Sequence, residues 1–173
     1  MKNKILNVPL LKQKKDTCGP TALRMIFKYF GKEINEKEII KFIGGLRKYG
    51  VRTIALADYA KYAGYQSKCF SFNEKAAGGK AEIERPNVKR IEEYLSKGVP
   101  VILLVRSFLL FNKKPSPNGH FIVITGYKNG IFFYNDPKDG QRHKISKEEL
   151  LFIWFNNVLE PSAYFVAIWP KKS

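Results

Sequence analysis

Apolar side chains recur every three or four residues through much of the first hundred positions, which is the spacing of helices that bury one face. Residue types that cap or stop helices bound these stretches, such as Asn35 before the second and Gly31 after the first. The pattern predicts helices at residues 18–30, 35–43, 53–62 and 87–96. In the second, Glu38 completes a capping box with Asn35, and four apolar residues should point inward: Ile39, Ile40, Phe42 and Ile43. We therefore expect an N-terminal helical layer.

The second half of the chain changes to short apolar runs and alternating patterns, which are typical of β-strands. Strands are predicted at residues 99–105, 120–127, 131–135, 142–145 and 163–169, after an earlier one at 66–72. The Lys-Asn-Gly sequence at 128–130 suits a tight hairpin, Ser146 and Glu149 form a capping box before one more helix, and residues 74–85 indicate a polar loop. We expect one domain over residues 1–173 with an α+β fold, its helical layer packed on a mainly antiparallel C-terminal sheet.

The composition adds a strong positive charge to this picture. The 173 residues are 45% apolar, enough for a buried core, and their formal net charge is +16. That charge would attract an anionic partner to a basic surface, but no zinc-finger, basic-zipper or RNA-recognition pattern favours nucleic acid. We find no signal-peptide pattern, and the most apolar run, residues 99–111, is too short for a transmembrane segment. With only two cysteines, the chain is expected to be cytoplasmic, with both thiols free.

Cys18 opens the first predicted helix, at a position that favours reactivity. A cysteine attacks a carbonyl carbon as the thiolate, and a helix N-terminus favours this charged form. Gly19 leaves room for a substrate backbone beside the sulfur, and Pro20 begins a helix at no cost in hydrogen bonds. Taken alone, Cys18 would equally suit a small buried residue, which is the role expected for Cys69 inside its strand.

A general base for this cysteine has to be one of two residues, His120 or His143. His120 opens an apolar strand directly after the polar loop at residues 112–119, so its ring should stand at the rim of a cleft. His143 lies between Arg142 and Lys144 and is expected to be a surface residue. His120 is therefore the expected base.

Asp136 and Gln13 have side chains that would complete such a site. An imidazole base needs an acceptor for its other nitrogen, and Asp136 ends the strand that the hairpin pairs with that of His120. Aspartate before proline is also an ordinary turn former, so both interpretations of Asp136 stay open. Gln13 offers an amide that, with the N–H of Cys18, would stabilise an oxyanion, although its position in a lysine-rich stretch also suits a surface residue.

These motifs together resemble those of the bacteriocin-processing peptidases, the double-glycine leader peptidases among the papain-like cysteine peptidases, and their freestanding relatives. The resemblance rests on residues 13–23, 119–127 and 135–137, and the order cysteine, histidine, aspartate agrees with it. Two features depart from the family pattern. Gln13 precedes the cysteine by five residues where six are usual, and the loops at 74–85 and 107–119 are long.

The resemblance implies a papain-like fold and cleavage of a peptide bond through a thioester. Cys18 would be the nucleophile, His120 the base and then the acid, Asp136 the residue that orients the histidine, and Gln13 a donor in the oxyanion hole. The implied partner is a peptide or protein substrate, and cleavage of a double-glycine leader is one option. The family members that process leaders are commonly fused to transport proteins.

Two other functions remain open from the sequence. One is a non-enzymatic binding module of the same fold that recognises a peptide or an anionic partner through its basic surface. The other is acyl transfer to an amine, which uses the same residues as hydrolysis. A metal site built from the two cysteines and two histidines lacks any CxxC or HxxxH spacing, so no metal or other cofactor is expected.

Overall fold

The structure, a computed structural model, describes residues 4–48 and 50–171. Within these ranges the helices are α1 (Cys18–Tyr29), α2 (Glu36–Phe42), α3 (Thr53–Tyr62), α4 (Glu74–Ala77), α5 (Val88–Ser96), α6 (Ser107–Leu110) and α7 (Lys147–Phe155). The strands are β1 (Lys4–Ile5), β2 (Tyr65–Ser71), β3 (Glu82–Ile83), β4 (Val101–Arg106), β5 (Gly119–Lys128), β6 (Ile131–Asp136), β7 (Gln141–Ser146) and β8 (Phe165–Pro170). None of the helices in these ranges is long and apolar enough to cross a membrane.

The described strands form a single mixed sheet in the order β3-β2-β8-β4-β5-β6-β7, and β1 pairs with the end of β5. Every pair is antiparallel except β2 and β3. The last strand, β8, lies between β2 and β4, so it joins the early strands to the later ones. The predicted α+β fold with a mainly antiparallel sheet is confirmed.

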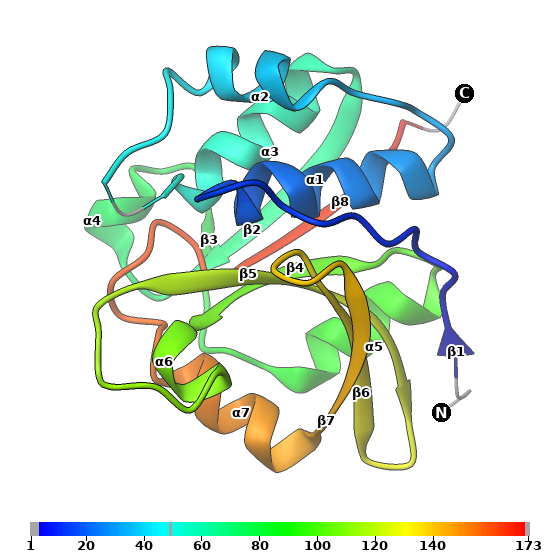
Figure 1. Cartoon of the computed structure of the whole chain (residues 1–173), viewed down its shortest axis with the longest axis vertical. Coiled ribbons are helices and arrows are strands. Elements are labelled where there is room, and N and C mark those ends of the chain that lie inside the picture. Colours follow the sequence, from blue (N-terminus) through cyan, green and yellow to red (C-terminus); the bar gives the residue numbers. More distant parts are fainter. Residues whose placement is uncertain (1–3, 49, 172–173) are drawn as a thin grey trace.

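The first three helices gather in the upper half of the view in Figure 1, above β4 and β5. Helix α1 packs against β5, and α3 packs against β2 and β8. The apolar face of α1 explains the position of this helix, because Leu23 and Phe27 are fully buried, as is Ile122 of β5. Helices α5 and α7 lie lower in the view and pack against β4. The predicted N-terminal helical layer is therefore present.

Local sequence signals set several element boundaries as predicted. Asn87 caps α5 by accepting the N–H of Lys89, and Ser146 and Glu149 form the reciprocal capping box of α7. The hairpin between β5 and β6 turns through Asn129 and Gly130, which both have positive φ angles. This hairpin sets the register that brings the start of β5 near the end of β6.

The predicted polar loop at residues 74–85 is wrong, because it contains α4 and β3. Asn73 caps α4 by accepting the N–H of Ala76 at 2.9 Å, and β3 pairs in parallel with the end of β2. Strand β3 depends on a partner outside the segment, so the local pattern did not reveal it, whereas α4 begins with a local cap at Asn73 that the prediction overlooked. Strand β1 and helix α6 were also absent from the predicted elements.

Helix α2 buries less than predicted. Ile39 is its buried residue, whereas the Phe42 side chain is 43% exposed and packs on Tyr59 and Tyr62. Asn35 caps the helix through the N–H of Lys37 instead of the predicted reciprocal pair with Glu38. The helix has only seven residues, so one face of two turns contacts the core and the remaining apolar side chains stay near the surface.

Candidate active site

Cys18 is the first residue of α1, as predicted. The chain enters the helix through Asp16, whose φ angle of 61° is uncommon for a residue other than glycine. The hydroxyl of Thr17 forms hydrogen bonds with the backbone of Lys14 and so fixes this entry. The Cys18 thiol is free and partly exposed, and its backbone N–H lies in the first helical turn, where N–H groups lack partners within the helix.

His120 and Asp136 meet across the β5–β6 hairpin. Nε2 of His120 lies 2.6 Å from Oδ1 of Asp136, and both side chains are buried. Cys18 lines the same cleft as this ring and contributes to raising the pKa of His120. Because Asp136 occupies Nε2, Nδ1 is the ring nitrogen left to face the sulfur. The structure therefore brings the three predicted residues together, since His120 contacts Asp136 and lines one cleft with Cys18.

The surroundings of His120 raise its pKa to about 9. Burial opposes the charged ring, but hydrogen bonds with Asp136 and Cys18 and their negative charges outweigh that cost. The pKa of Asp136 is lowered, since the hydrogen bond and charge of His120 and the N–H of Lys138 outweigh its burial. These directions favour an imidazolium ring paired with the Asp136 carboxylate at neutral pH.

Gln13 lies at the same site, in the segment before α1. Its backbone N–H donates to the carbonyl of Pro137 at 2.7 Å, which ties the segment before α1 to the turn after Asp136. Its side chain lines the cleft that contains Cys18 and His120, and its Oε1 atom is buried without a hydrogen-bond partner. The shorter spacing to Cys18 thus does not remove Gln13 from the site.

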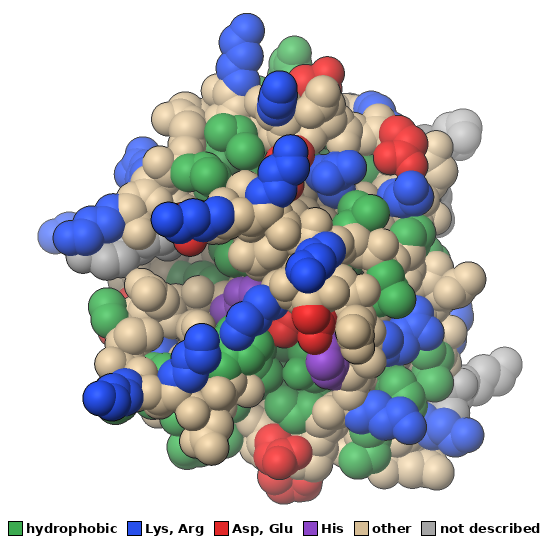
Figure 2. All heavy atoms as spheres, viewed as in Figure 1, with side chains coloured by type: hydrophobic (Ala, Val, Ile, Leu, Met, Phe, Trp, Pro, Cys, Tyr) green, Lys and Arg blue, Asp and Glu red, His purple; other side chains and the backbone are tan. Residues whose placement is uncertain are grey.

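These residues line a cleft of about 330 Å³. One wall comes from the start of α1 and from the segment that includes Lys48, Gly50 and Val51. The opposite wall comes from β4, from the start of β5 and from the 107–119 segment with α6. Figure 2 shows Lys and Arg side chains gathered along both edges of the hollow at the left of the view. The long loop at 107–119 is therefore part of the cleft.

Sequence reasoning missed two residues that surround the histidine. The Phe111 ring packs against the His120 ring, with 5.1 Å between centroids, and Nζ of Lys138 lies 3.4 Å from the centroid of Phe111. In the sequence, Phe111 is the last residue of an apolar run, and Lys138 directly follows the Asp-Pro pair at 136–137. Nothing in the sequence pattern paired these two residues with each other.

The remaining cysteine and histidine lie elsewhere. Cys69 is buried within β2, and burial raises its pKa to about 12. His143 is on β7, where it stacks on Tyr134 and forms a 2.8 Å hydrogen bond with Asp139. In the described ranges no group of three or more His, Cys, Asp or Glu residues is placed to hold a metal ion.

The model of the Peptidase_C39 like family matches residues 5–158 of the chain. The chain belongs to this family. The matched range includes Gln13, Cys18, His120 and Asp136. No curated protein matches the sequence.

Solved structures with the same fold include other members of this group. A Bacillus anthracis protein described as C39-like peptidase aligns over 100% of both chains, with a TM-score of 0.71 and 16% identity. The peptidase domain of Streptococcus ComA, a bifunctional ABC transporter, has a TM-score of 0.60 and 16% identity, covering 95% of this chain and 100% of that domain. A double-glycine motif protease from an AMS/PCAT transporter, in complex with the leader peptide, has a TM-score of 0.59 and 20% identity, covering 99% and 100%. At these identities the likeness establishes the shared fold.

Proposed function

We propose that this protein is a cysteine peptidase that hydrolyses peptide bonds through Cys18, His120 and Asp136. The observation that carries the proposal is the position of His120, which forms a 2.6 Å hydrogen bond with Asp136 and lines one cleft with Cys18. Membership of the Peptidase_C39 like family supports the same chemistry. A reducing, cytoplasmic location, predicted from the presence of only two cysteines, would keep the nucleophile active.

In the first half-reaction, the Cys18 thiolate attacks the carbonyl carbon of the scissile bond. The oxyanion that forms accepts hydrogen bonds from the backbone N–H of Cys18 and from the side-chain amide of Gln13. The His120 imidazolium then gives its proton to the leaving amine, the C–N bond breaks, and a thioester remains on Cys18. Asp136 holds the ring through Nε2, so that Nδ1 stays directed at the sulfur.

In the second half-reaction, His120 acts as a base. It takes a proton from water, the hydroxide oxygen adds to the thioester carbonyl, and the sulfur leaves as thiolate. The new carboxylate is released, and His120 is again protonated. Peptides with a double-glycine leader are one substrate to test, because one structural neighbour was solved with such a leader.

The direct test is peptide hydrolysis by the purified chain, with mass-spectrometric detection of products. Cleavage should be lost in Cys18→Ala and kept in Cys69→Ala, which removes the buried thiol of β2. Reaction in water enriched in oxygen-18 should place one heavy oxygen in the new C-terminal carboxylate, which separates hydrolysis from transfer to an amine. Cleavage that survives in Cys18→Ala, or a failure of the wild type to cleave any peptide of a random library, would refute the proposal.

A further inference from the structure

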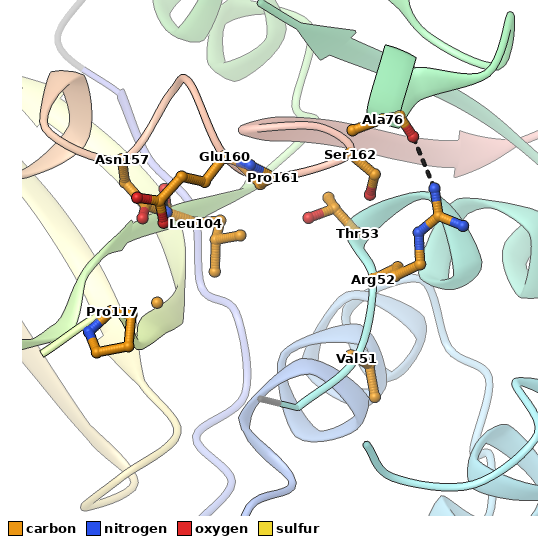
Figure 3. Close-up of a pocket in the computed structure, with 11 residues that line it drawn as sticks. Val51, Arg52, Thr53, Ala76, Leu104, Pro117, Asn157, Glu160, Pro161 and Ser162 are labelled. Carbon is orange, nitrogen blue, oxygen red and sulfur yellow. Dashed lines mark hydrogen bonds between the residues drawn. The ribbon is translucent and has the colours of Figure 1, made fainter. Parts of the chain in front are cut away.

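A second pocket of about 240 Å³ lies next to the cleft of Cys18 (Figure 3). Val51, Leu104 and Gly119 line both spaces, so the two are direct neighbours. On one side of the second pocket lies the start of α3 with Arg52 and Thr53. On the other side lie Pro117 and the segment from Asn157 to Ser162. A peptide in the catalytic cleft could therefore place one side chain here.

Thr53 marks the floor of this pocket. Its side chain is 1% exposed, and its Oγ1 atom is buried without a hydrogen-bond partner. Figure 3 shows this hydroxyl turned toward the Leu104 side of the pocket. A buried hydroxyl without a partner costs free energy comparable to a lost hydrogen bond. A ligand group that accepts a hydrogen bond from this hydroxyl would therefore be favoured.

The other polar groups around Thr53 also favour a negatively charged ligand group. Thr53 begins α3, a ten-residue helix whose N-terminus carries partial positive charge. Ser162 accepts the N–H of Ile54 at 3.4 Å, which leaves its hydroxyl proton for a ligand. Arg52 uses one guanidinium nitrogen to bind the carbonyl of Ala76 at 2.6 Å and has further N–H groups at the pocket wall.

Glu160 is the one acidic side chain that lines this pocket, and it already has a partner. Nη1 of Arg106 binds its carboxylate at 3.1 Å. Across these two neighbouring spaces, the lining carries more basic than acidic side chains: Lys48, Arg52, Lys113 and Lys138 against Asp16 and Glu160. The local charge therefore attracts an acidic peptide and disfavours a basic one.

We infer that the pocket at the start of α3 is a substrate subsite that selects an acidic side chain, with Thr53 and Arg52 as its specificity residues. The inference rests on the proposed peptidase function and adds the class of peptide that the cleft accepts. The substrate carboxylate accepts hydrogen bonds from the hydroxyls of Thr53 and Ser162 and pairs with the guanidinium of Arg52.

Internally quenched peptides test this subsite. Each position around the cleaved bond is fixed in turn as Glu, Gln, Leu or Lys, and kcat/KM is measured for every set. At one position Glu should exceed Gln by about tenfold, which is the size of one charge-assisted hydrogen bond. A preference for Leu at every position, or no preference for Glu at any, would overturn the inference.

Matched variants connect that preference to the pocket. Arg52→Glu should change the preference for Glu into a preference for Lys. Thr53→Val keeps the shape of the side chain and removes the hydroxyl, so it should reduce the preference for Glu. Thr53→Ser keeps the hydroxyl and should keep that preference. The control is Lys89→Glu, which changes the net charge by the same amount as Arg52→Glu. Lys89 is an exposed residue of α5 and lines neither space, so this variant should leave the preference for Glu unchanged. If the preference for Glu persists in both Arg52→Glu and Thr53→Val, the subsite lies elsewhere and the inference fails.

Binding to Cys18→Ala separates this inference from the proposed function. Fluorescence anisotropy with the same labelled peptides should show the Glu preference and its dependence on Arg52 without any cleavage. If this binding is seen while the wild type cleaves nothing, the peptidase proposal fails and the subsite stands. If the wild type cleaves peptides without regard to Glu, the subsite fails and the peptidase proposal stands.

Discussion

Oδ1 of Asp136 binds two groups at once, Nε2 of His120 at 2.6 Å and the backbone N–H of Lys138 at 2.8 Å. The second bond closes a turn on the aspartate's own side chain. Both interpretations that the sequence left open, a turn former and a partner of the histidine, therefore describe the same carboxylate. The turn holds the carboxylate in place, and the carboxylate holds the ring.

Replacing Asp136 should reduce catalysis more than it reduces peptide binding. Asp136→Ala leaves His120 without its acceptor, so we expect kcat/KM to fall by roughly 10²-fold or more. Asp136→Asn keeps an acceptor oxygen and should lose less. The matched control is Asp139→Ala, which removes the same residue type from the exposed pair with His143. Equal losses in the two alanine variants would contradict the proposed role.

The pH profile of kcat/KM should have an alkaline limb near pH 9. Hydrogen bonds and charges from Asp136 and Cys18 raise the pKa of His120 to about 9, despite its burial. The ring stays protonated below that pH, ready to protonate the leaving amine, and activity declines as it loses the proton. In His143→Ala this limb should be unchanged. A limb near the ordinary histidine pKa, about 6.5, would contradict the coupling to Cys18 and Asp136.

The same coupling should make folding stability depend on pH. The pKa of His120 is higher in the folded chain than the ordinary histidine value of 6.5, so its contribution to stability is fully present below pH 6.5 and is lost as pH rises through about 9. Between these limits the free energy of unfolding should fall by an amount on the order of 1–3 kcal/mol more in the wild type than in His120→Gln. Urea titrations at both limits measure the difference, with His143→Gln as the control. Parallel pH dependence in wild type and His120→Gln would argue against the prediction.

Alkylation with iodoacetamide should separate the two cysteines. Cys18 is partly exposed beside a protonated histidine, whereas burial raises the pKa of Cys69 to about 12. At neutral pH we expect Cys18 to react roughly 100-fold faster or more, since the thiolate is the reacting form. Peptide mapping at successive times measures both rates. Similar rates in the folded wild type would remove the support for Cys18 as nucleophile.

The sequence predicts the grouping of Cys18, His120 and Asp136 because the position of each depends on a short-range signal. Cys18 follows from a helix start, and the contact of His120 with Asp136 follows from one hairpin whose turn residues are evident. Phe111 and the subsite at Thr53 were not predicted, because both depend on segments brought together by the complete sheet. The polar loop at 74–85 failed for the same reason, since β3 exists only by pairing with β2.

Gly19 should be replaceable only when Val51 is made smaller. A Cβ atom at position 19 would lie 2.5 Å from Cγ2 of Val51 and 3.1 Å from Cε2 of Phe121, closer than such atoms normally approach. Gly19→Ala should therefore lower the free energy of unfolding by roughly 1–3 kcal/mol and disturb the cleft wall that Val51 forms. Val51→Ala removes the atom that clashes, so the double variant should recover part of that loss. A double-mutant cycle from urea titrations measures this coupling, and additive effects would show that the contact does not restrict position 19.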